Sequence, residues 1–316
     1  MKHLNIYIML LGFSIFTGAT FNLAKYTVGY FSPSSSAAWR FGLAAAVMLI
    51  ILIFTEGIKK SQLRKNAVSY IVLGIIGIFG FNALFFVGLK YTSPVNGALI
   101  MGLNPLLTAI LARIILKDKM TKKQVLGILF AFIGVLLVIT QGSIETIKTL
   151  SISGGDLIIF TGNVCWALYG VLGRRFVKDG TPLSTTTYTM VIGAVSLIVV
   201  SLFTSKPVSL SNIPIGVWGA IAFMAFFTSV LGYLWWNQGI KEIGASKTSL
   251  FFNLVPVVTM IISFAIGTPI KVFQVIGAVL VILGVLTASG VIRIPKYNTK
   301  EQSAIKRIGS IFEKMC

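Results

Sequence analysis

Long runs of apolar residues, separated by short polar segments, cover most of the 316-residue chain. A helix that crosses the hydrocarbon core of a bilayer needs about 20 such residues. Ten runs reach roughly this length, so the pattern predicts ten membrane-spanning helices in an all-α integral membrane protein. The predicted helices cover residues 5–27, 34–54, 68–89, 93–116, 123–140, 154–174, 184–204, 214–236, 246–267 and 272–292.

Part of the sequence occurs twice. Residues 85–110 read FFVGLKYTSPVNGALIMGLNPLLTAI, and residues 236–261 read WNQGIKEIGASKTSLFFNLVPVVTMI. The two stretches align without a gap at an offset of 151 positions, which places Pro105 on Pro256. An internal repeat dictates the architecture of a protein. Further matched pairs are Gly88 and Gly239, Gln124 and Gln274, Gly127 and Gly277, and Gly134 and Gly284.

The duplication divides the chain into a first five-helix repeat (1–140), an extramembrane linker (141–153), a second five-helix repeat (154–292) and a basic tail (293–316). Because five is odd, the second repeat crosses the membrane in the opposite orientation, as in inverted-topology transporters. With the N-terminus inside, 20 of the 27 Lys and Arg residues fall on the cytoplasmic side. The positive-inside rule therefore predicts a multi-pass protein of the cytoplasmic (inner) membrane with both termini cytoplasmic.

Composition agrees with this topology. The chain is 56% hydrophobic and only 11% charged, whereas soluble domains carry about 25% charged residues. The net charge of +19 would suit a nucleic-acid binder, but the basic residues lie between apolar runs, as topology signals do. We expect a lipid bilayer around the chain and no nucleic-acid partner.

Two terminal segments have alternatives. Residues 1–19 have the layout of a secretory signal, but the apolar run continues beyond them, so we interpret them as part of a retained first helix. In the tail, Ile305, Ile308, Phe312 and Met315 recur at helical spacing among basic residues. This indicates a helix lying on the anionic inner leaflet, and a disordered tail is the equally weighted alternative.

Polar side chains inside the predicted spans are candidates for a substrate site, because a polar group in hydrocarbon is costly unless it has a partner or borders water. Four asparagines qualify: Asn82, Asn104, Asn163 and Asn253. An asparagine side chain both donates and accepts hydrogen bonds, which suits a zwitterionic or amide-bearing ligand. Interhelical hydrogen bonding is the alternative role.

Aromatic residues would supply the apolar walls of such a site. Trp166 and Tyr169 are three residues apart and share a helix face, which we expect to face the cavity rather than lipid. The candidate substrate-binding residues are Asn82, Phe85, Met101, Asn104, Asn163, Trp166, Tyr169, Tyr233, Phe252 and Asn253.

The matched prolines Pro105 and Pro256 are candidate hinges. A proline frees the carbonyl four residues earlier, here that of Met101 or Phe252. A freed carbonyl could bind substrate or permit bending during transport, and a static kink satisfied by neighbours is the alternative.

Three basic residues, Lys25, Arg40 and Arg113, lie near the ends of predicted spans. Long basic side chains reach out of the membrane to the interface, so we interpret all three in this way. The less favoured alternative is a cation that binds a carboxylate or gates the pathway.

None of the eight acidic residues is predicted to lie mid-membrane, although a proton antiporter for cationic drugs usually needs an embedded carboxylate. The absence favours a neutral or zwitterionic substrate. The single histidine, His3, and the cysteines Cys165 and Cys316 form no ligand motif. We therefore predict no metal site, no cofactor and no catalytic residues, and the lack of a Walker motif argues against direct ATP coupling.

The chain resembles the EamA-type ten-helix transporters of the drug/metabolite transporter superfamily. The resemblance covers residues 5–290 as two units, and its specificity lies in order, spacing and duplication. It is carried by Arg40-Phe41, GLKYTSPVNGALI at 88–100 with Asn104-Pro105, Gly155-Asp156, Trp166-Ala167-Leu168-Tyr169, and the duplicated Gln and Gly positions. A glutamate that often follows the fourth helix of such units is replaced here by Asp118 and Thr268.

This resemblance implies a secondary active or facilitative transporter that moves a small metabolite, such as an amino acid, by alternating access. Export is the commoner direction of transport in that family, so the resemblance favours export over uptake. Uptake or exchange of a metabolite such as S-adenosylmethionine is the alternative, and a membrane receptor or intramembrane enzyme is a remote one. A homodimer stays open. We expect selectivity where the two copies differ, as at Gly102 against Asn253 and Asn82 against Tyr233.

Overall fold

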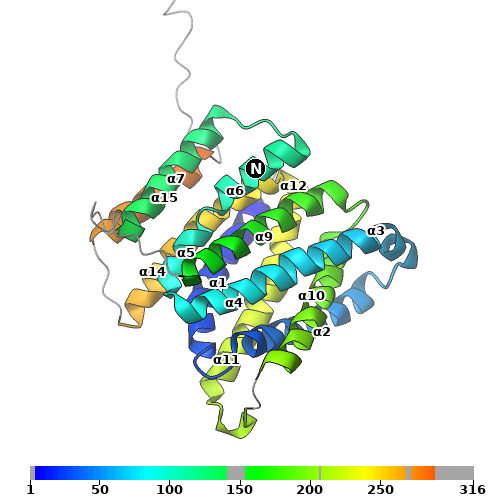
Figure 1. Cartoon of the computed structure of the whole chain (residues 1–316). Helices are drawn as coiled ribbons and strands as arrows, with labels where there is room; N and C mark the ends of the chain where they lie inside the picture. The colour runs from blue at the N-terminus through cyan, green and yellow to red at the C-terminus, as the bar shows by residue number, and fades with distance from the viewer. Residues whose placement is uncertain (1–3, 141–153, 206–207, 268–271, 289–316) are drawn as a thin grey trace, which may run out of the picture.

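The computed structural model describes residues 4–140, 154–205, 208–267 and 272–288. The linker and the basic tail with its expected interfacial helix therefore lie outside the described residues. Every element in the described part is helical (Figure 1). Eight helical segments are long and apolar enough to cross a membrane, and α7 and α15 are two further apolar helices. The predicted all-α membrane protein with two five-helix repeats is confirmed.

The two repeats use the same order of elements. The first contains α1 (Leu4–Thr27), α2 (Pro33–Thr55), a third span of α3 (Lys60–Leu73), η1 (Gly74–Gly80) and α4 (Phe81–Tyr91), a fourth of α5 (Pro94–Met101), α6 (Asn104–Leu111) and η2 (Ala112–Leu116), and α7 (Lys122–Thr140). The second contains α9 (Gly154–Phe176), α10 (Pro182–Thr204), a third span of α11 (Ile215–Phe223), η4 (Met224–Gly232) and α12 (Tyr233–Ile243), a fourth of α13 (Ala245–Ser249), η5 (Leu250–Leu254) and α14 (Val255–Ala265), and α15 (Val272–Ala288). A single turn, η3 (Leu210–Asn212), precedes α11.

Three helices begin with the same device. Ser32, Ser93 and Thr181 each precede a proline, and each side-chain oxygen accepts a hydrogen bond from the backbone N–H three residues later. The proline occupies a position whose N–H would lack a helical partner in any case. These Ser-Pro and Thr-Pro pairs therefore fix where α2, α5 and α10 start.

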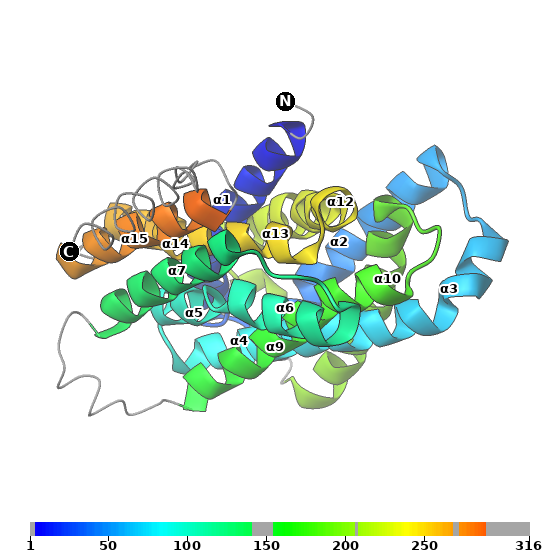
Figure 2. The same cartoon turned by 90° about the horizontal axis from the view of Figure 1, so that it is seen from above.

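The repeats interlock rather than stand side by side. Helix α1 packs against η4, α12 and α14 of the second repeat, and its counterpart α9 packs against η1, α4 and α6 of the first. Equivalent helices also pair with each other: α2 with α10 at one flank, and α7 with α15 at the other (Figures 1 and 2). The contacts therefore follow the twofold relationship that the sequence duplication predicts.

Matched glycines allow the close crossing of α7 and α15. A Cβ atom added to Gly134 would lie 2.6 Å from the carbonyl oxygen of Gly277, and one added to Gly284 would lie 2.6 Å from that of Gly127. Small residues let membrane helices approach closely and gain van der Waals contact. The glycines shared by both copies of the sequence thus build a symmetric helix pair.

The third and fourth spans are irregular at equivalent places in both repeats. The third spans contain the π-helical segments η1 and η4. The fourth spans are interrupted just before the matched prolines, by a turn at Gly102–Leu103 and by the 3₁₀ segment η5. Sequence alone predicted the proline sites but not the π segments. Broken helices and π segments are typical of functional regions in membrane proteins.

The third span is longer than its apolar run. The run begins at residue 68, whereas α3 begins at Lys60. Residues 60–67 are mostly polar, but Lys, Gln, Leu, Arg and Ala are good helix formers, so the helix continues beyond the predicted hydrocarbon boundary. The length of an apolar run predicts which part of a helix lies in the hydrocarbon core, and it does not predict where the helix begins.

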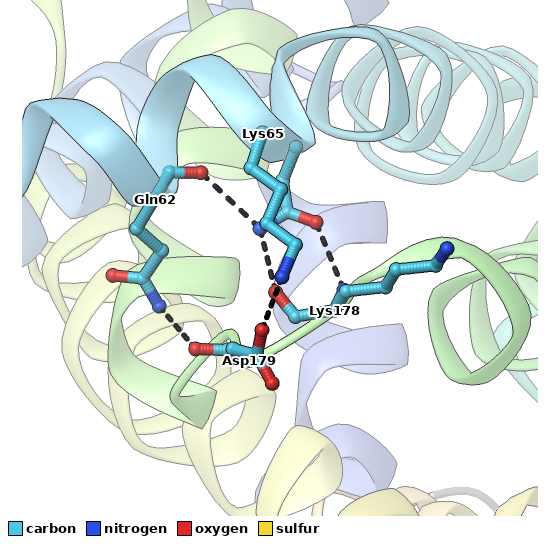
Figure 3. A network of polar contacts seen from close by, with 5 residues as sticks. Gln62, Lys65, Lys178 and Asp179 are labelled. Carbon is cyan, nitrogen blue, oxygen red and sulfur yellow. Dashed lines mark hydrogen bonds and ion pairs between the residues drawn. The ribbon is translucent and has the colours of Figure 1, made fainter.

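A polar network holds this extension against the loop between α9 and α10 (Figure 3). Asn66 Nδ2 donates to the carbonyl of Lys178 at 2.9 Å, and the Lys178 N–H donates to Asn66 Oδ1 at 2.9 Å. Gln62 Nε2 donates to the carbonyl of Asp179 at 2.7 Å, and Lys65 forms an ion pair with the Asp179 carboxylate. The network joins the two repeats at one end of the bundle.

Candidate functional site

A cluster of aromatic rings centred on Trp166 lies where the repeats meet. Its ring centroid is 4.8 Å from that of Tyr233, 5.1 Å from Phe81 and 5.3 Å from Trp236. Tyr169 stacks on it at 5.3 Å with an interplanar angle of 17°, so the two residues share a helix face as predicted. Trp166 is only 1% exposed, and its indole N–H has no hydrogen-bond partner within the described chain.

A small cavity lies against this cluster. It is bounded by side chains from α1, α2, α4, α5, α9, η4, α12 and η5, and therefore by both repeats. Its volume of about 20 Å³ has room for roughly one water molecule. A molecule of the size of an amino acid does not fit in this volume. Five predicted binding residues line it: Phe85, Met101, Trp166, Tyr233 and Phe252.

Asn82 reaches the same cavity wall through Tyr233. Its Nδ2 donates to the Tyr233 hydroxyl oxygen at 3.0 Å and to the Ile78 carbonyl at 2.8 Å. Its Oδ1 is buried without a partner in the described chain. Residues 82 and 233 occupy equivalent positions in the two repeats, so this hydrogen bond lies close to the approximate twofold axis.

Asn253 also faces its repeat equivalent. Together with Gly102 and Pro105 it lines a second small cavity of about 10 Å³. Asn253 is fully buried, and neither its Nδ2 nor its Oδ1 has a hydrogen-bond partner in the described chain. A buried amide with both groups unpaired is rare in native proteins and calls for an explanation.

Asn104 and Asn163 have a different role. Asn104 Nδ2 donates to Asn163 Oδ1 at 2.8 Å, and Asn163 Nδ2 donates to the Ile100 carbonyl at 2.8 Å. Thr108 Oγ1 donates to Asn104 Oδ1 at 3.1 Å. These bonds hold α9 against the break between α5 and α6. Both asparagines are thus engaged in interhelical hydrogen bonds and do not line the central cavity.

Tyr169 lies behind Trp166 and connects the aromatic cluster to a polar pocket. Its hydroxyl accepts from Asn237 Nδ2 at 2.8 Å, and Asn237 also lines a pocket of about 510 Å³ between α9, α10 and α12. Arg174 and Lys241 contribute to that pocket. The pocket opens at the end of the bundle that carries the network of Figure 3.

The candidate hinges Pro105 and Pro256 are both buried and begin the helices that follow each break. One expectation about their carbonyls is wrong. The Phe252 carbonyl accepts a hydrogen bond from the Val255 N–H, because the chain tightens to a 3₁₀ turn there. Phe252 therefore contributes its ring to the site and not a free carbonyl.

The three basic residues near span ends differ. Lys25 Nζ donates to the carbonyls of Leu89 at 2.7 Å and Thr92 at 2.9 Å, and so caps α4. Arg113 is exposed, as expected. The interpretation that Arg40 extends to the interface is wrong: it is 3% exposed and lines the central cavity. Its position seven residues inside α2, at a depth of about 10 Å, was the signal for burial.

Threonines of the cavity wall were also missed by sequence reasoning. Thr20 and Thr228 share a hydrogen bond of 2.8 Å between their hydroxyl oxygens. The Thr17 hydroxyl is buried without a partner in the described residues. Threonine is so common in membrane helices that the sequence offers no distinguishing signal for these three.

Comparisons with known proteins agree with this architecture. The model of the EamA-like transporter family matches residues 4–140 and again residues 153–290. A protein of Bacillus subtilis (strain 168), described as uncharacterized transporter YyaM, is 99% identical over 305 residues, which are 96% of this chain and 100% of that protein. An uncharacterized transporter of Archaeoglobus fulgidus is 29% identical over 273 residues, 85% of this chain and 93% of that protein. One solved crystal structure shares the fold with a TM-score of 0.70 at 21% identity, over 90% of this chain and 97% of that one.

Proposed function

This chain belongs to the EamA-like transporter family, and we propose that it moves a small neutral or zwitterionic metabolite, an amino acid or related compound, by alternating access. Its relatives are named as transporters and not as enzymes. The proposed direction is export across the cytoplasmic membrane, with both chain termini in the cytoplasm.

The closed cavity at the repeat interface, with unpaired polar atoms in and beside its walls, is the observation that carries this proposal. The buried groups without partners in the described chain include the Thr17 hydroxyl, the Trp166 indole N–H and both amide groups of Asn253. Leaving such a group unpaired costs about 1–3 kcal/mol. A ligand that supplies the missing partners accounts for their presence.

The paired irregularities supply a route for opening. A site closed to about 20 Å³ must widen toward one side of the membrane and then the other before a metabolite can pass. Both repeats interrupt the fourth span just before Pro105 or Pro256, and both carry a π-helical segment in the third span. Small changes at these matched breaks would move one repeat against the other.

The charge of the walls supports a neutral or zwitterionic substrate. No Asp or Glu is among the residues that bound the central cavity in the described chain, whereas Arg40 is. A cationic drug would meet a cation there with no carboxylate to offset it. The remaining wall is aromatic and hydroxyl-bearing, which suits a small molecule with an apolar part.

Counterflow in proteoliposomes tests the proposal. Vesicles containing purified protein and an excess of one unlabelled amino acid should accumulate the same labelled amino acid, for at least one member of the standard set. Trp166→Ala should reduce the initial rate at least tenfold. The matched control is Trp218→Ala, because Trp218 packs against Trp39 in a separate apolar groove and does not line the central cavity. Equal rates in the two variants, or no exchange by the unaltered protein, would contradict the proposal.

A further inference from the structure

Arg40 is a buried cation on the wall of the central cavity. It lies on α2 and is 3% exposed. The cavity that it bounds is also bounded by Trp166, Tyr233 and Phe252 from the other repeat. Its side chain therefore faces the interface between the repeats and not the lipid.

Only part of the hydrogen-bonding capacity of the Arg40 guanidinium is used by the described protein. Nε donates to the Ser229 hydroxyl at 2.9 Å. The guanidinium carbon lies 4.8 Å from the ring centroid of Phe41 and 6.0 Å from that of Phe86. A guanidinium has five N–H donors and no acceptor. One hydroxyl and two ring faces leave donors free and provide no negative charge.

The carboxylates of the described chain are engaged elsewhere. The ion pairs of Lys65 with Asp179 and of Arg174 with Asp118 lie near or beyond helix ends. None of the described acidic side chains pairs with Arg40. Each described carboxylate has another partner. The pairs are Glu56 with Thr181, Asp118 with Arg174, Asp156 with Thr92, Asp179 with Lys65, and Glu242 with Gln238.

An uncompensated charge in this position is costly. Burying an ion in a protein interior is unfavourable unless a counter-ion and hydrogen bonds compensate for the lost hydration. Arginine cannot reduce the cost by losing its proton under physiological conditions. An ionisable side chain that faces the interior of a membrane bundle is therefore a candidate for ligand binding.

We propose that Arg40 binds the carboxylate of the transported molecule, so that the substrate is a zwitterionic molecule with a carboxylate and an apolar body. This inference rests on the proposed function and narrows its substrate class. The planar guanidinium matches a carboxylate through two parallel N–H···O bonds. Such a pair would neutralise both charges inside the membrane and permit the carboxylate to cross it.

The rest of the wall indicates which part of the ligand lies where. The rings of Phe81, Phe85 and Phe252 face the same cavity as Arg40, so they receive the apolar body. The cavity wall offers hydroxyl groups but no carboxylate for an ammonium group. We therefore expect the carboxylate to be required for binding and the amino group to contribute less.

Matched ligands test this prediction in the unaltered protein. The full chain is purified in detergent, and its melting temperature is measured with phenylalanine and leucine, with their amides, with the corresponding amines, and with the acids that lack the amino group. A ligand that binds only the folded state raises the melting temperature in proportion to its affinity. The ligands with a carboxylate, which are the two amino acids and the acids that lack the amino group, should stabilise the protein. The amides and amines, which have no carboxylate, should bind at least tenfold more weakly.

Variants then locate the effect. Arg40→Gln should weaken binding of the acids at least tenfold and leave the weak binding of the amides unchanged. Arg40→Lys retains the charge without the planar fork and should have an intermediate affinity. Arg113→Gln is the matched control, since Arg113 is exposed, and it should bind like the unaltered protein.

Several results would overturn the inference: equal binding of acids and amides, unchanged acid binding in Arg40→Gln, or no stabilisation by any acid. The ligand comparison decides the matter even where Arg40→Gln does not fold. Failure of the proposed function gives a different result. Acid binding that depends on Arg40, without counterflow, would refute transport and support the carboxylate site at Arg40. Counterflow of amides and acids at equal rates would support transport and refute the carboxylate site.

Discussion

Asn82 donates a hydrogen bond to Tyr233 at 3.0 Å, and these two residues occupy the same position in the two copies of the repeat. A contact between equivalent positions lies near the axis that relates the copies. Asn82 and Tyr233 have diverged in chemical type while remaining in contact. The duplication has thus produced an asymmetric hydrogen bond at the centre of a nearly symmetric fold.

The first prediction concerns this bond. Tyr233→Phe and Asn82→Ala should each destabilise the folded protein by about 1 kcal/mol, the usual value of a hydrogen bond within a protein. The two losses should not add in the double variant, because both substitutions remove the same interaction. Unfolding of the purified protein measures all four free energies. Additive losses would show that the contact contributes nothing to stability.

Asn253 should oppose stability and support transport. Asn253→Leu removes two unpaired polar groups from a buried site, so we expect stability to rise by about 1–2 kcal/mol while counterflow falls at least tenfold. Thermal unfolding and transport are measured on the same preparation. Asn163→Leu is the matched control, since Asn163 is hydrogen-bonded on both sides and its loss should destabilise the protein. A destabilised Asn253→Leu would mean that its amide has structural partners.

The crossing of α7 and α15 should depend on its glycines. Gly134→Val and Gly284→Val each place a side chain against a backbone carbonyl at 2.6 Å, and such overpacking costs about 1–3 kcal/mol. Gly219→Ala is the control, because an added Cβ there meets no atom within 4 Å. Thermal unfolding should show loss in both valine variants and none in the control. An unchanged stability of Gly134→Val would show that α7 and α15 do not approach each other this closely.

The ion pair of Figure 3 predicts a dependence on pH. The hydrogen bond and positive charge of Lys65 hold the pKa of Asp179 below its ordinary value of 3.8. Because the folded-state pKa is depressed, the pair stabilises the protein at neutral pH, and this contribution is lost as the pH falls below 3.8. Unaltered protein and Asp179→Asn should therefore differ in melting temperature at pH 7 and converge in acid.

Lys65→Met provides the control for this effect. In that background Asp179→Asn should change the pH dependence much less, because only the smaller effect of Lys178 on the pKa of Asp179 is left. Two results would contradict a stabilising ion pair between Lys65 and Asp179. One is a difference in melting temperature between the unaltered protein and Asp179→Asn that persists at low pH, and the other is an equally large difference in the Lys65→Met background.

The architecture was predictable because it depends on patterns that sequence contains. Apolar length predicted the spans, and the repeat predicted two equivalent five-helix halves; the structure adds that the matched glycines 134 and 284 lie where α7 and α15 cross. Trp166 and Tyr233 were predicted as site residues because ligand pockets favour aromatic walls, with lipid-facing packing as the alternative. Each of these inferences needs only local composition or the register of the duplication.

The chemistry of the site was less predictable because it depends on contacts between distant segments. Asn104, Asn163 and Asn253 are alike in sequence, yet the first two pair with each other and the third has no partner among the described residues. Arg40 was interpreted as a residue at the membrane interface, although it is buried against Ser229 of η4 and Phe86 of α4. The depth of about 10 Å inside α2 indicated burial, but only the three-dimensional fold shows that the side chain faces the central cavity.

Accessibility of Met101 from each side of the membrane tests the central claim most directly. Met101 is fully buried on the cavity wall, and it is replaced by cysteine after both native cysteines are changed to serine. Right-side-out and inside-out vesicles are treated with a membrane-impermeant thiol reagent. Alternating access predicts labelling in both preparations, with protection by a bound substrate. Labelling from one side only, or from neither, would contradict a site that opens in turn to each face of the membrane.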